Sequence, residues 1–242
     1  MSSSIYFLSD AHLGAGPDAT EALKKKNLLR LCDRVRADAA DLYIAGDLFD
    51  FWFEYRTVVQ TQHLDVIAML KSLRTAGISI TFLAGNHDFW VGRFFERELG
   101  IRVVKSWCEL DAGGKRLFLA HGDGLERGDW GYRFLLKPLL RNPVSIWLFG
   151  LLHPDLAVPL ARWISRTSRH AIAAQERKHG APLREVAKAK LAHGYDAVVM
   201  GHCHAPELTV DGGKTYLNLG DFFEHFTYGV WRNGTLSLEK ML

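Results

Sequence analysis

Residues 5–12 read Ile-Tyr-Phe-Leu-Ser-Asp-Ala-His, a short apolar run followed at once by an aspartate and a histidine. The same arrangement recurs along the chain, each time with polar residues at the end of an apolar run. Because open α/β sheets place their ligands at the carboxyl ends of strands, we expect these polar residues at one edge of a sheet. Five motifs carry the pattern: Asp10-Ala11-His12, Gly46-Asp47, Gly85-Asn86-His87-Asp88, His121-Gly122 and Gly201-His202-Cys203-His204.

The first part of the chain alternates predicted strands with predicted helices. Apolar runs predict strands over residues 5–8, 42–45 and 78–84. Between them, apolar residues recur at helical spacing from Leu23 to Val35 and from Leu64 to Leu73. Strands that alternate with helices are typical of βαβ units, so this part predicts an α/β fold with a mainly parallel sheet.

From Ile101 onward the pattern changes to short strands joined by tight turns. We therefore expect a second, more antiparallel sheet that packs face to face with the first, with helices outside. The predicted strands cover residues 103–104, 116–120, 196–200, 215–219, 227–231 and 235–238, and the turn signals are Asp111-Ala112-Gly113-Gly114, Asp211-Gly212-Gly213 and Asn233-Gly234.

The spacing of the motifs indicates an insertion. The first donor residues of the first four motifs, Asp10, Asp47, Asn86 and His121, are 37, 39 and 35 residues apart. The step from His121 to His202, the first donor of the fifth motif, is 81 residues. About one extra unit, approximately residues 124–190, therefore lies between the fourth and fifth motifs. We expect it to form a helical lobe over the site, within a single domain that spans residues 1–242.

An unusually apolar segment, residues 134–164, lies inside this insertion. Four prolines and several charged residues interrupt it, and its longest uninterrupted stretch is well short of the roughly 20 residues that a membrane-spanning helix needs. Two interpretations remain open. The segment could lie on a membrane or hold an apolar ligand, or it could form a buried helical hairpin inside the domain.

Composition excludes several other classes. The formal charge of +3 is too small to indicate a nucleic-acid partner, and nothing in the sequence points to an obligate protein partner. Three scattered cysteines, Cys32, Cys108 and Cys203, do not form a disulfide framework. Because residues 1–4 run straight into an apolar strand without a basic leader, we expect a cytoplasmic protein.

The motifs contain the donors of a metal centre. In a strand, residues i and i+2 face the same side, so Asp10 and His12 can bind one ion together, as can His202 and His204. Carboxylate, amide and imidazole donors without thiolate suit Mn²⁺, Fe²⁺, Zn²⁺ or Mg²⁺. A carboxylate such as Asp47 can bridge two such ions and leave between them a water of lowered pKa.

With all five motifs intact and in order, the sequence resembles the calcineurin-like metallophosphoesterases over essentially its whole length. The resemblance implies a four-layer α/β/β/α sandwich with two divalent ions, most simply Mn²⁺. It also implies His87 as general acid or charge stabiliser, with Asp88 orienting it and Asn86 beside it. By the same resemblance, Asp10, His12, Asp47 and His204 would hold one ion, and Asp47, Asn86, His121 and His202 the other.

Within that superfamily, the sequence is similar to the UDP-2,3-diacylglucosamine diphosphatases of lipid A synthesis. The similarity rests on size, on Asp47-Leu48-Phe49-Asp50-Phe51-Trp52, and on the residues that follow His121. It implies hydrolysis of a lipidated sugar nucleotide to UMP and an acylated sugar 1-phosphate, at the cytoplasmic face of the inner membrane. Residues expected at the substrate are Asp123, Asp129, Tyr132 and Arg169, with Arg133, Lys137, Arg166 and Arg177 as further cations near the diphosphate.

One position departs from that pattern, because the best-known members carry arginine where this chain has His87. UMP leaves readily and scarcely needs a proton, whereas an alkoxide does. A proton donor at His87 therefore leaves another phosphodiesterase or nucleotide pyrophosphatase activity open as the alternative. A binding scaffold without catalysis would lack some of the metal ligands, and in this sequence every ligand is present.

Overall fold

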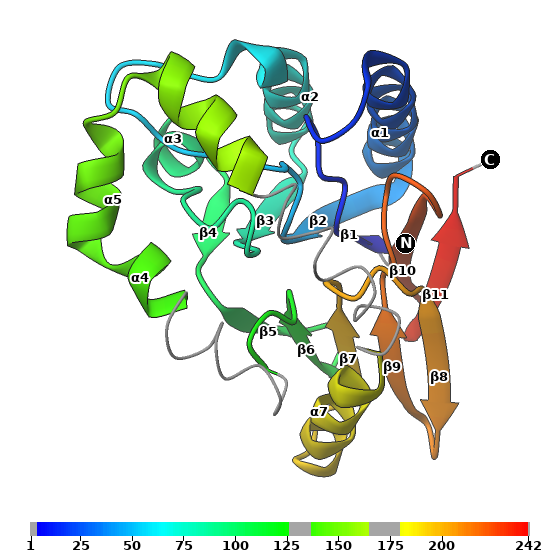
Figure 1. The fold of residues 1–242 in the computed structure, drawn as a ribbon. Coiled ribbons are helices and arrows are strands. Elements are labelled where there is room, and N and C mark those ends of the chain that lie inside the picture. The colour runs from blue at the N-terminus through cyan, green and yellow to red at the C-terminus, as the bar shows by residue number, and fades with distance from the viewer. Residues whose placement is uncertain (1–3, 126–136, 165–179, 242) are drawn as a thin grey trace.

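The computed structural model describes residues 4–125, 137–164 and 180–241, and contains two β-sheets (Figure 1). The first sheet has the order β11-β10-β1-β2-β3-β4. Its strands β1 to β4 are parallel, and β10 joins antiparallel to β1. The strands are β1 (Ser4–Leu8), β2 (Ala39–Ala45), β3 (Ser79–Leu83), β4 (Arg102–Val104), β10 (Thr227–Arg232) and β11 (Thr235–Lys240).

The second sheet has the order β5-β6-β7-β9-β8. Its three central strands are parallel, and an antiparallel strand closes each edge. The predicted strands and turns therefore form, but the predicted sheet is wrong for three of the strands. Both β4 and the final hairpin, β10 and β11, join the first sheet rather than the second. The strands of the second sheet are β5 (Trp107–Asp111), β6 (Arg116–Ala120), β7 (Ala197–Met200), β8 (Glu207–Asp211) and β9 (Lys214–Asn218).

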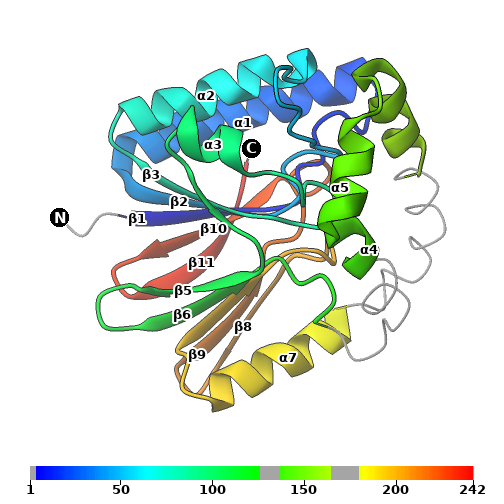
Figure 2. The same cartoon turned by 90° about the vertical axis from the view of Figure 1, so that its left-hand side faces the viewer.

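Helices cover the outer face of each sheet, so the molecule has the predicted α/β/β/α layers (Figure 2). The helices α1 (Asp18–Asp38), α2 (Leu64–Thr75) and α3 (Arg93–Arg97) cover the first sheet, with a short 3₁₀ turn, Thr61–His63, before α2. The second sheet is covered by α7 (Gly180–Ala192). Because α7 packs on this sheet through Leu183 and Ala187, the last part of the predicted insertion belongs to the sandwich.

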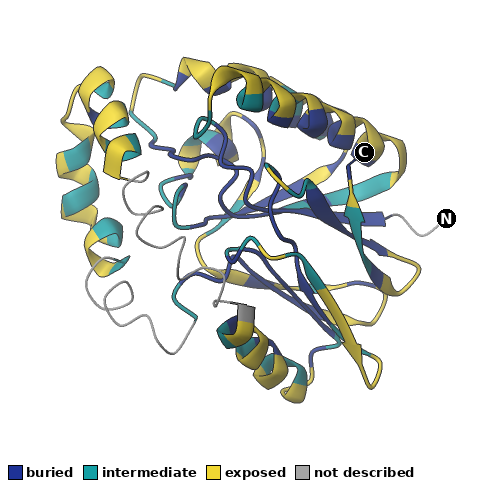
Figure 3. Cartoon of the chain, turned by 45° about the vertical axis from the view of Figure 1, so that its right-hand side comes forward, coloured by how far each residue is buried: buried dark blue, intermediate teal, exposed yellow. Residues whose placement is uncertain are grey.

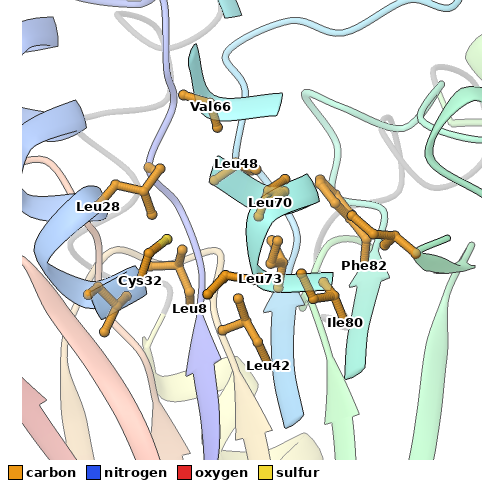
Figure 4. Close-up of a cluster of buried hydrophobic side chains, with 14 of the residues drawn as sticks. Leu8, Leu28, Cys32, Leu42, Leu48, Val66, Leu70, Leu73, Ile80 and Phe82 are labelled. Carbon is orange, nitrogen blue, oxygen red and sulfur yellow. The ribbon is translucent and has the colours of Figure 1, made fainter. Parts of the chain in front are cut away.

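Side-chain alternation along the strands builds three apolar layers between these elements. In β1, Tyr6 and Leu8 face the helices, whereas Ile5 and Phe7 face the second sheet. Figure 4 shows the helix-side layer, in which leucines of β1, α1 and α2 meet. Cys203 packs in the layer under α7, and the described cysteines are buried and form no disulfide with one another.

The rest of the described insertion is a group of short helices at the side of the sandwich: α4 (Lys137–Arg141), α5 (Pro143–Gly150) and a helix over residues 154–164. Asn142 caps α5, since its Oδ1 accepts from the N–H of Val144 at 2.8 Å. These helices expose much of their apolar surface, in contrast to the buried strands (Figure 3). We call them the lobe helices; their exposure contradicts the interpretation as a buried hairpin. Over the described residues, none of the helices has the length and apolar character needed to cross a membrane.

Candidate metal centre

The five motifs follow β1, β2, β3, β6 and β7, and they meet at the carboxyl edges of both sheets. The expected strand alternation within Asp10-Ala11-His12 is wrong, however, because β1 ends at Leu8 and β7 at Met200. Five of the seven predicted ligands instead lie in left-handed backbone after the strands. Described residues other than glycine with a positive φ include Asp10, His12, Asp47, His202 and His204.

Left-handed backbone is costly for residues with a side chain, and it collects at functional sites where the surroundings enforce it. Here glycines allow the loops to approach closely. A Cβ on Gly85 would lie 2.0 Å from Oδ1 of Asp47, and one on Gly201 would lie 2.0 Å from Oγ of Ser9. The motif glycines are therefore required for close approach as well as for turning the chain.

Asp10, His12 and His204 form the first group of donors. Nε2 of His204 lies 3.2 Å from both Oδ1 of Asp10 and Nε2 of His12. Oδ1 of Asp10 and Nδ1 of His12 are buried without a hydrogen-bond partner among the described residues. Three donor atoms that converge within 4.8 Å, one of them an orphaned carboxylate oxygen, fit a cation.

Asp47 lies between this group and a second group of donors. Its Oδ2 is 3.8 Å from Nε2 of His12 and 3.3 Å from Nε2 of His121. Oδ1 of Asn86 approaches the same His121 nitrogen at 3.0 Å. Nδ1 of His121 lies 2.9 Å from the carbonyl of Ala45, to which it donates. That bond directs Nε2 toward the donors, because a hydrogen bond to one ring nitrogen orients the other nitrogen of a metal-binding histidine.

Among the predicted ligands, His202 is the one whose side chain contacts these two groups least closely. Its ring lies edge-on to that of His121, with centroids 5.1 Å apart, and the backbone N–H of His202 donates to Oδ2 of Asp10 at 2.9 Å. The structure thus brings the predicted donors to one place, with His202 on the side of His121.

Burial and neighbouring charges shift the pKa values of the donor residues. Burial lowers the pKa of His12 and of His202 to about 4, so both imidazoles are neutral at pH 7. Burial opposes ionisation of Asp47, but the charges of His121 and His87 outweigh it and lower the carboxyl pKa. The pKa of His121 stays well above its usual value, because Asp47 outweighs the effect of burial. The carboxylates of Asp10 and Asp47, together with the neutral imidazoles of His12 and His202, suit divalent cations.

His87 contacts Asp50, a partner that the sequence reasoning did not identify. Nδ1 of His87 lies 3.1 Å from the carbonyl oxygen of Asp50 and 3.6 Å from its carboxylate. Asp88 instead accepts from the N–H groups of Gly85 at 2.9 Å, Asp47 at 3.2 Å and Phe49 at 3.3 Å. Asp88 therefore holds two motif loops together. Burial, reinforced by the Asp47 charge, raises the pKa of Asp88 to about 7.

Sequence reasoning missed further supports of the site. Nζ of Lys24, buried on α1, donates to the carbonyl of His12 at 2.6 Å and pairs with Glu21 at 2.6 Å. Glu21 accepts from the N–H groups of Gly14 and Gly16 at 2.7 and 2.8 Å. The only available signal was a charged pair, three residues apart, at the start of a helix.

The predicted substrate residues are only partly described. Oδ2 of Asp123 lies 2.6 Å from Nζ of Lys137 and 3.5 Å from Arg141, so Asp123 ties α4 to the fourth motif. Arg141 also covers the ring of Phe89 at 4.0 Å. Asp129, Tyr132 and Arg169, and the cations Arg133, Arg166 and Arg177, lie outside the described residues.

The sequence of this chain is similar to those of known proteins. The family model of the calcineurin-like phosphoesterases matches residues 3–206. A UDP-2,3-diacylglucosamine hydrolase of Porphyromonas gingivalis is 33% identical and covers 100% of this chain and 98% of its own. Proteins with the same name from Aeromonas salmonicida and Pseudomonas putida are each 32% identical, over 98% and 86% of this chain and 93% and 86% of their own. The chain therefore belongs to the calcineurin-like phosphoesterase family.

Proposed function

We propose that this protein hydrolyses the diphosphate of UDP-2,3-diacylglucosamine, releasing UMP and 2,3-diacylglucosamine 1-phosphate. Relatives that carry the name of this hydrolase, at 32 to 33% identity over most of the chain, support the substrate. One structural observation carries the chemistry. The carboxylate of Asp47 lies between His12 and His121, at the position of a bridging ligand between two groups of donors.

The donors would hold two divalent ions, and we propose Mn²⁺. Asp10, His12, Asp47 and His204 would hold the first, and Asp47, Asn86, His121 and His202 the second. Bound ions of this kind supply a water of lowered pKa and neutralise the charge of the phosphoryl group. The carboxylate, amide and imidazole donors also accept Fe²⁺, Zn²⁺ or Mg²⁺.

His87 supplies the protein's own contribution at the leaving group. Its Nδ1 donates to the carbonyl of Asp50, so Nε2 is the nitrogen that can hold or deliver a proton. Because UMP departs without needing a proton, His87 would act mainly by stabilising charge. For an ester with a poorer leaving group it would act as a general acid.

The lobe helices support a lipid substrate. Their exposed side chains include Trp147 at 63%, Trp163 at 65% and Leu156 at 70% exposure. We propose that this surface meets the acyl chains and the cytoplasmic face of the inner membrane, since each buried CH₂ contributes about 0.8 kcal/mol and tryptophan favours the membrane interface.

Binding to phosphatidylglycerol vesicles tests the membrane part of this proposal. The double variant Trp147→Ser and Trp163→Ser should bind the vesicles less than the parent protein. Trp107→Ser, which removes a tryptophan that is exposed on the second sheet, should bind like the parent protein. Equal vesicle binding by all three proteins would contradict the assignment of this surface.

Substrate comparison tests the reaction itself. Initial rates should be measured on UDP-2,3-diacylglucosamine, on UDP-N-acetylglucosamine and on bis(p-nitrophenyl) phosphate. We expect kcat/KM to be highest for the diacylated nucleotide. Turnover of the generic diester without turnover of the diacylated nucleotide would keep the metal centre and favour the alternative, a broader phosphodiesterase.

A further inference from the structure

The chain crosses from the second sheet to the first over residues 218–227, and this crossover is bonded to both the first and the last motif. Asn218, which is fully buried, donates from Nδ2 to the carbonyl of Gly201 at 2.9 Å and accepts from the N–H of Gly220 at 3.0 Å. Farther along, the N–H of Phe222 donates to the carbonyl of Asp10 at 2.9 Å. The crossover is therefore fixed against the two motifs that supply the first group of donors.

Asp221 makes the tip of the crossover rigid. Its Oδ1 accepts from the N–H groups of Phe223 at 3.0 Å, Glu224 at 2.6 Å and His225 at 3.0 Å, and its Oδ2 pairs with the ring of His225. The carboxylate is buried, and these four contacts lie within the turn. Asp221 thus determines where the side chain of Phe223 lies.

Phe223 contacts two ligands of the first group at once. Its ring lies edge-on to His204, with centroids 5.3 Å apart at 89°, and to His12, at 5.8 Å and 73°. Edge-on contacts between aromatic rings are favourable and directional. The side chain of His204 is 21% exposed, unlike that of His12, so its rotamer depends more on this contact.

We propose that Phe223 is a positioning residue for the ion held by Asp10, His12 and His204, an inference that rests on the proposed metal centre. Phe223 holds the two imidazoles so that their Nε2 atoms converge. His121, on the other side of Asp47, has its own partners in Ala45 and His202. Loss of the Phe223 ring should therefore weaken one ion and spare the other.

Mn²⁺ binding provides a readout that is separate from activity. Equilibrium titration followed by electron paramagnetic resonance should give two bound ions in the parent protein. In Phe223→Ala one dissociation constant should rise by about 10- to 100-fold, the usual effect of removing a residue that orients a metal ligand. Phe223→Tyr, which keeps the ring, should restore binding.

Phe226→Ala is the matched control. Phe226 lies in the same turn and pairs with Phe222 at 5.6 Å, away from the ligands. Its loss should lower thermal stability and leave both dissociation constants unchanged. If Phe223→Ala does not fold, Phe223→Leu replaces it, with a smaller rise of the same constant. Unchanged Mn²⁺ binding in the Phe223 variant, or an equal loss in Phe226→Ala, would overturn the proposal.

A double-variant comparison identifies the ion. With His202→Ala as background, Phe223→Ala should further weaken the remaining ion. With His204→Ala as background its added effect should be smaller than in the parent protein, because one of the two ligands that it positions is already gone. The reverse pattern would contradict the assignment. A parent protein that binds fewer than two ions would instead refute the metal centre on which the proposed function depends.

Discussion

The Nε2 atoms of His12 and His204 lie 3.2 Å apart, although 192 residues separate the two histidines in the chain. Oδ1 of Asp10 faces the same point, at 3.7 Å from His12 and 3.2 Å from His204. Two imidazole nitrogens in hydrogen-bond contact cannot both donate, so at least one of them must present a lone pair. A cation between the three atoms satisfies all of them, which makes metal binding the central expectation of this geometry.

Metal binding should release protons near pH 7. Asp47 holds the pKa of His121 well above its usual value, so without metal the imidazole carries a proton that a bound ion must displace. We expect about one proton released, and weaker binding as the pH falls. Calorimetry of Mn²⁺ binding in buffers of different ionisation enthalpy measures this number. A binding enthalpy that does not depend on the buffer would contradict it.

The free energy of unfolding should fall on mild acidification because several histidines are buried. Burial lowers the pKa of His63 to about 3, and of His12 and His202 to about 4, below the value of about 6.5 in an unfolded chain. Below pH 6.5 the unfolded state therefore binds more protons. Each histidine lowers the free energy of unfolding by up to about 1.4 kcal/mol per pH unit until its folded pKa is reached.

His63→Phe isolates this effect away from the metal ligands. His63 packs against Phe49, with ring centroids 4.7 Å apart, so a phenyl ring suits the position. Urea unfolding of the metal-free protein between pH 7 and pH 5 should show a shallower pH dependence in the variant. The exposed His193 provides the control, and His193→Gln should keep the parent slope. If the free energy of unfolding of His63→Phe falls with pH as steeply as that of the parent protein, the role of His63 is refuted.

Replacement of His87 should change the rates of cleavage differently for substrates with good and with poor leaving groups. In His87→Arg, UMP release from the diphosphate should stay within about tenfold of the parent rate, because arginine still stabilises charge. Cleavage of an alkyl phosphodiester should fall by about 10²- to 10⁴-fold, the usual contribution of a general acid. Steady-state rates on both substrates, with His193→Arg as control, measure the difference. An equal loss on both substrates would contradict the charge-stabilising role.

Asp123 should couple the lobe to the substrate lipid. Asp123→Asn removes the charge that pairs with Lys137 at 2.6 Å, and a hydrogen bond to a charged group contributes about 1.5 to 3 kcal/mol. We expect kcat/KM for the diacylated nucleotide to fall about tenfold, with a smaller change for bis(p-nitrophenyl) phosphate. Asp155→Asn, at an exposed position of the same lobe, is the control. Equal losses on both substrates would refute the coupling.

Much of the fold follows from local sequence patterns. Apolar runs and helical spacing predicted the βαβ part, and Asn233-Gly234 predicted the last hairpin, where both residues have positive φ. The local sequence does not indicate which strand this hairpin pairs with. Its pairing with β1, where Tyr6 faces Val230, depends on contacts more than 200 residues apart.

The sequence predicted which donor residues the fold brings together, but not their backbone conformation. The motifs carry no signal of the left-handed conformation of Asp10 and His12, nor of the contact from Lys24, outside the motifs, to the carbonyl of His12. The same holds for Phe223, whose role depends on the crossover between the sheets. Tertiary contacts determine these features, and a linear pattern carries no signal of them.

Hydrolysis of UDP-2,3-diacylglucosamine by metal-stripped protein resupplied with Mn²⁺ tests the proposed two-metal reaction most directly. Phosphorus NMR should show UMP and the acylated sugar 1-phosphate only when Mn²⁺ is present. Asp47→Ala should lower the rate by about 10³-fold, because it removes the bridging ligand and several kcal/mol of charge stabilisation with it. Equal turnover without metal, or full activity of Asp47→Ala, would contradict the two-metal hydrolase described above.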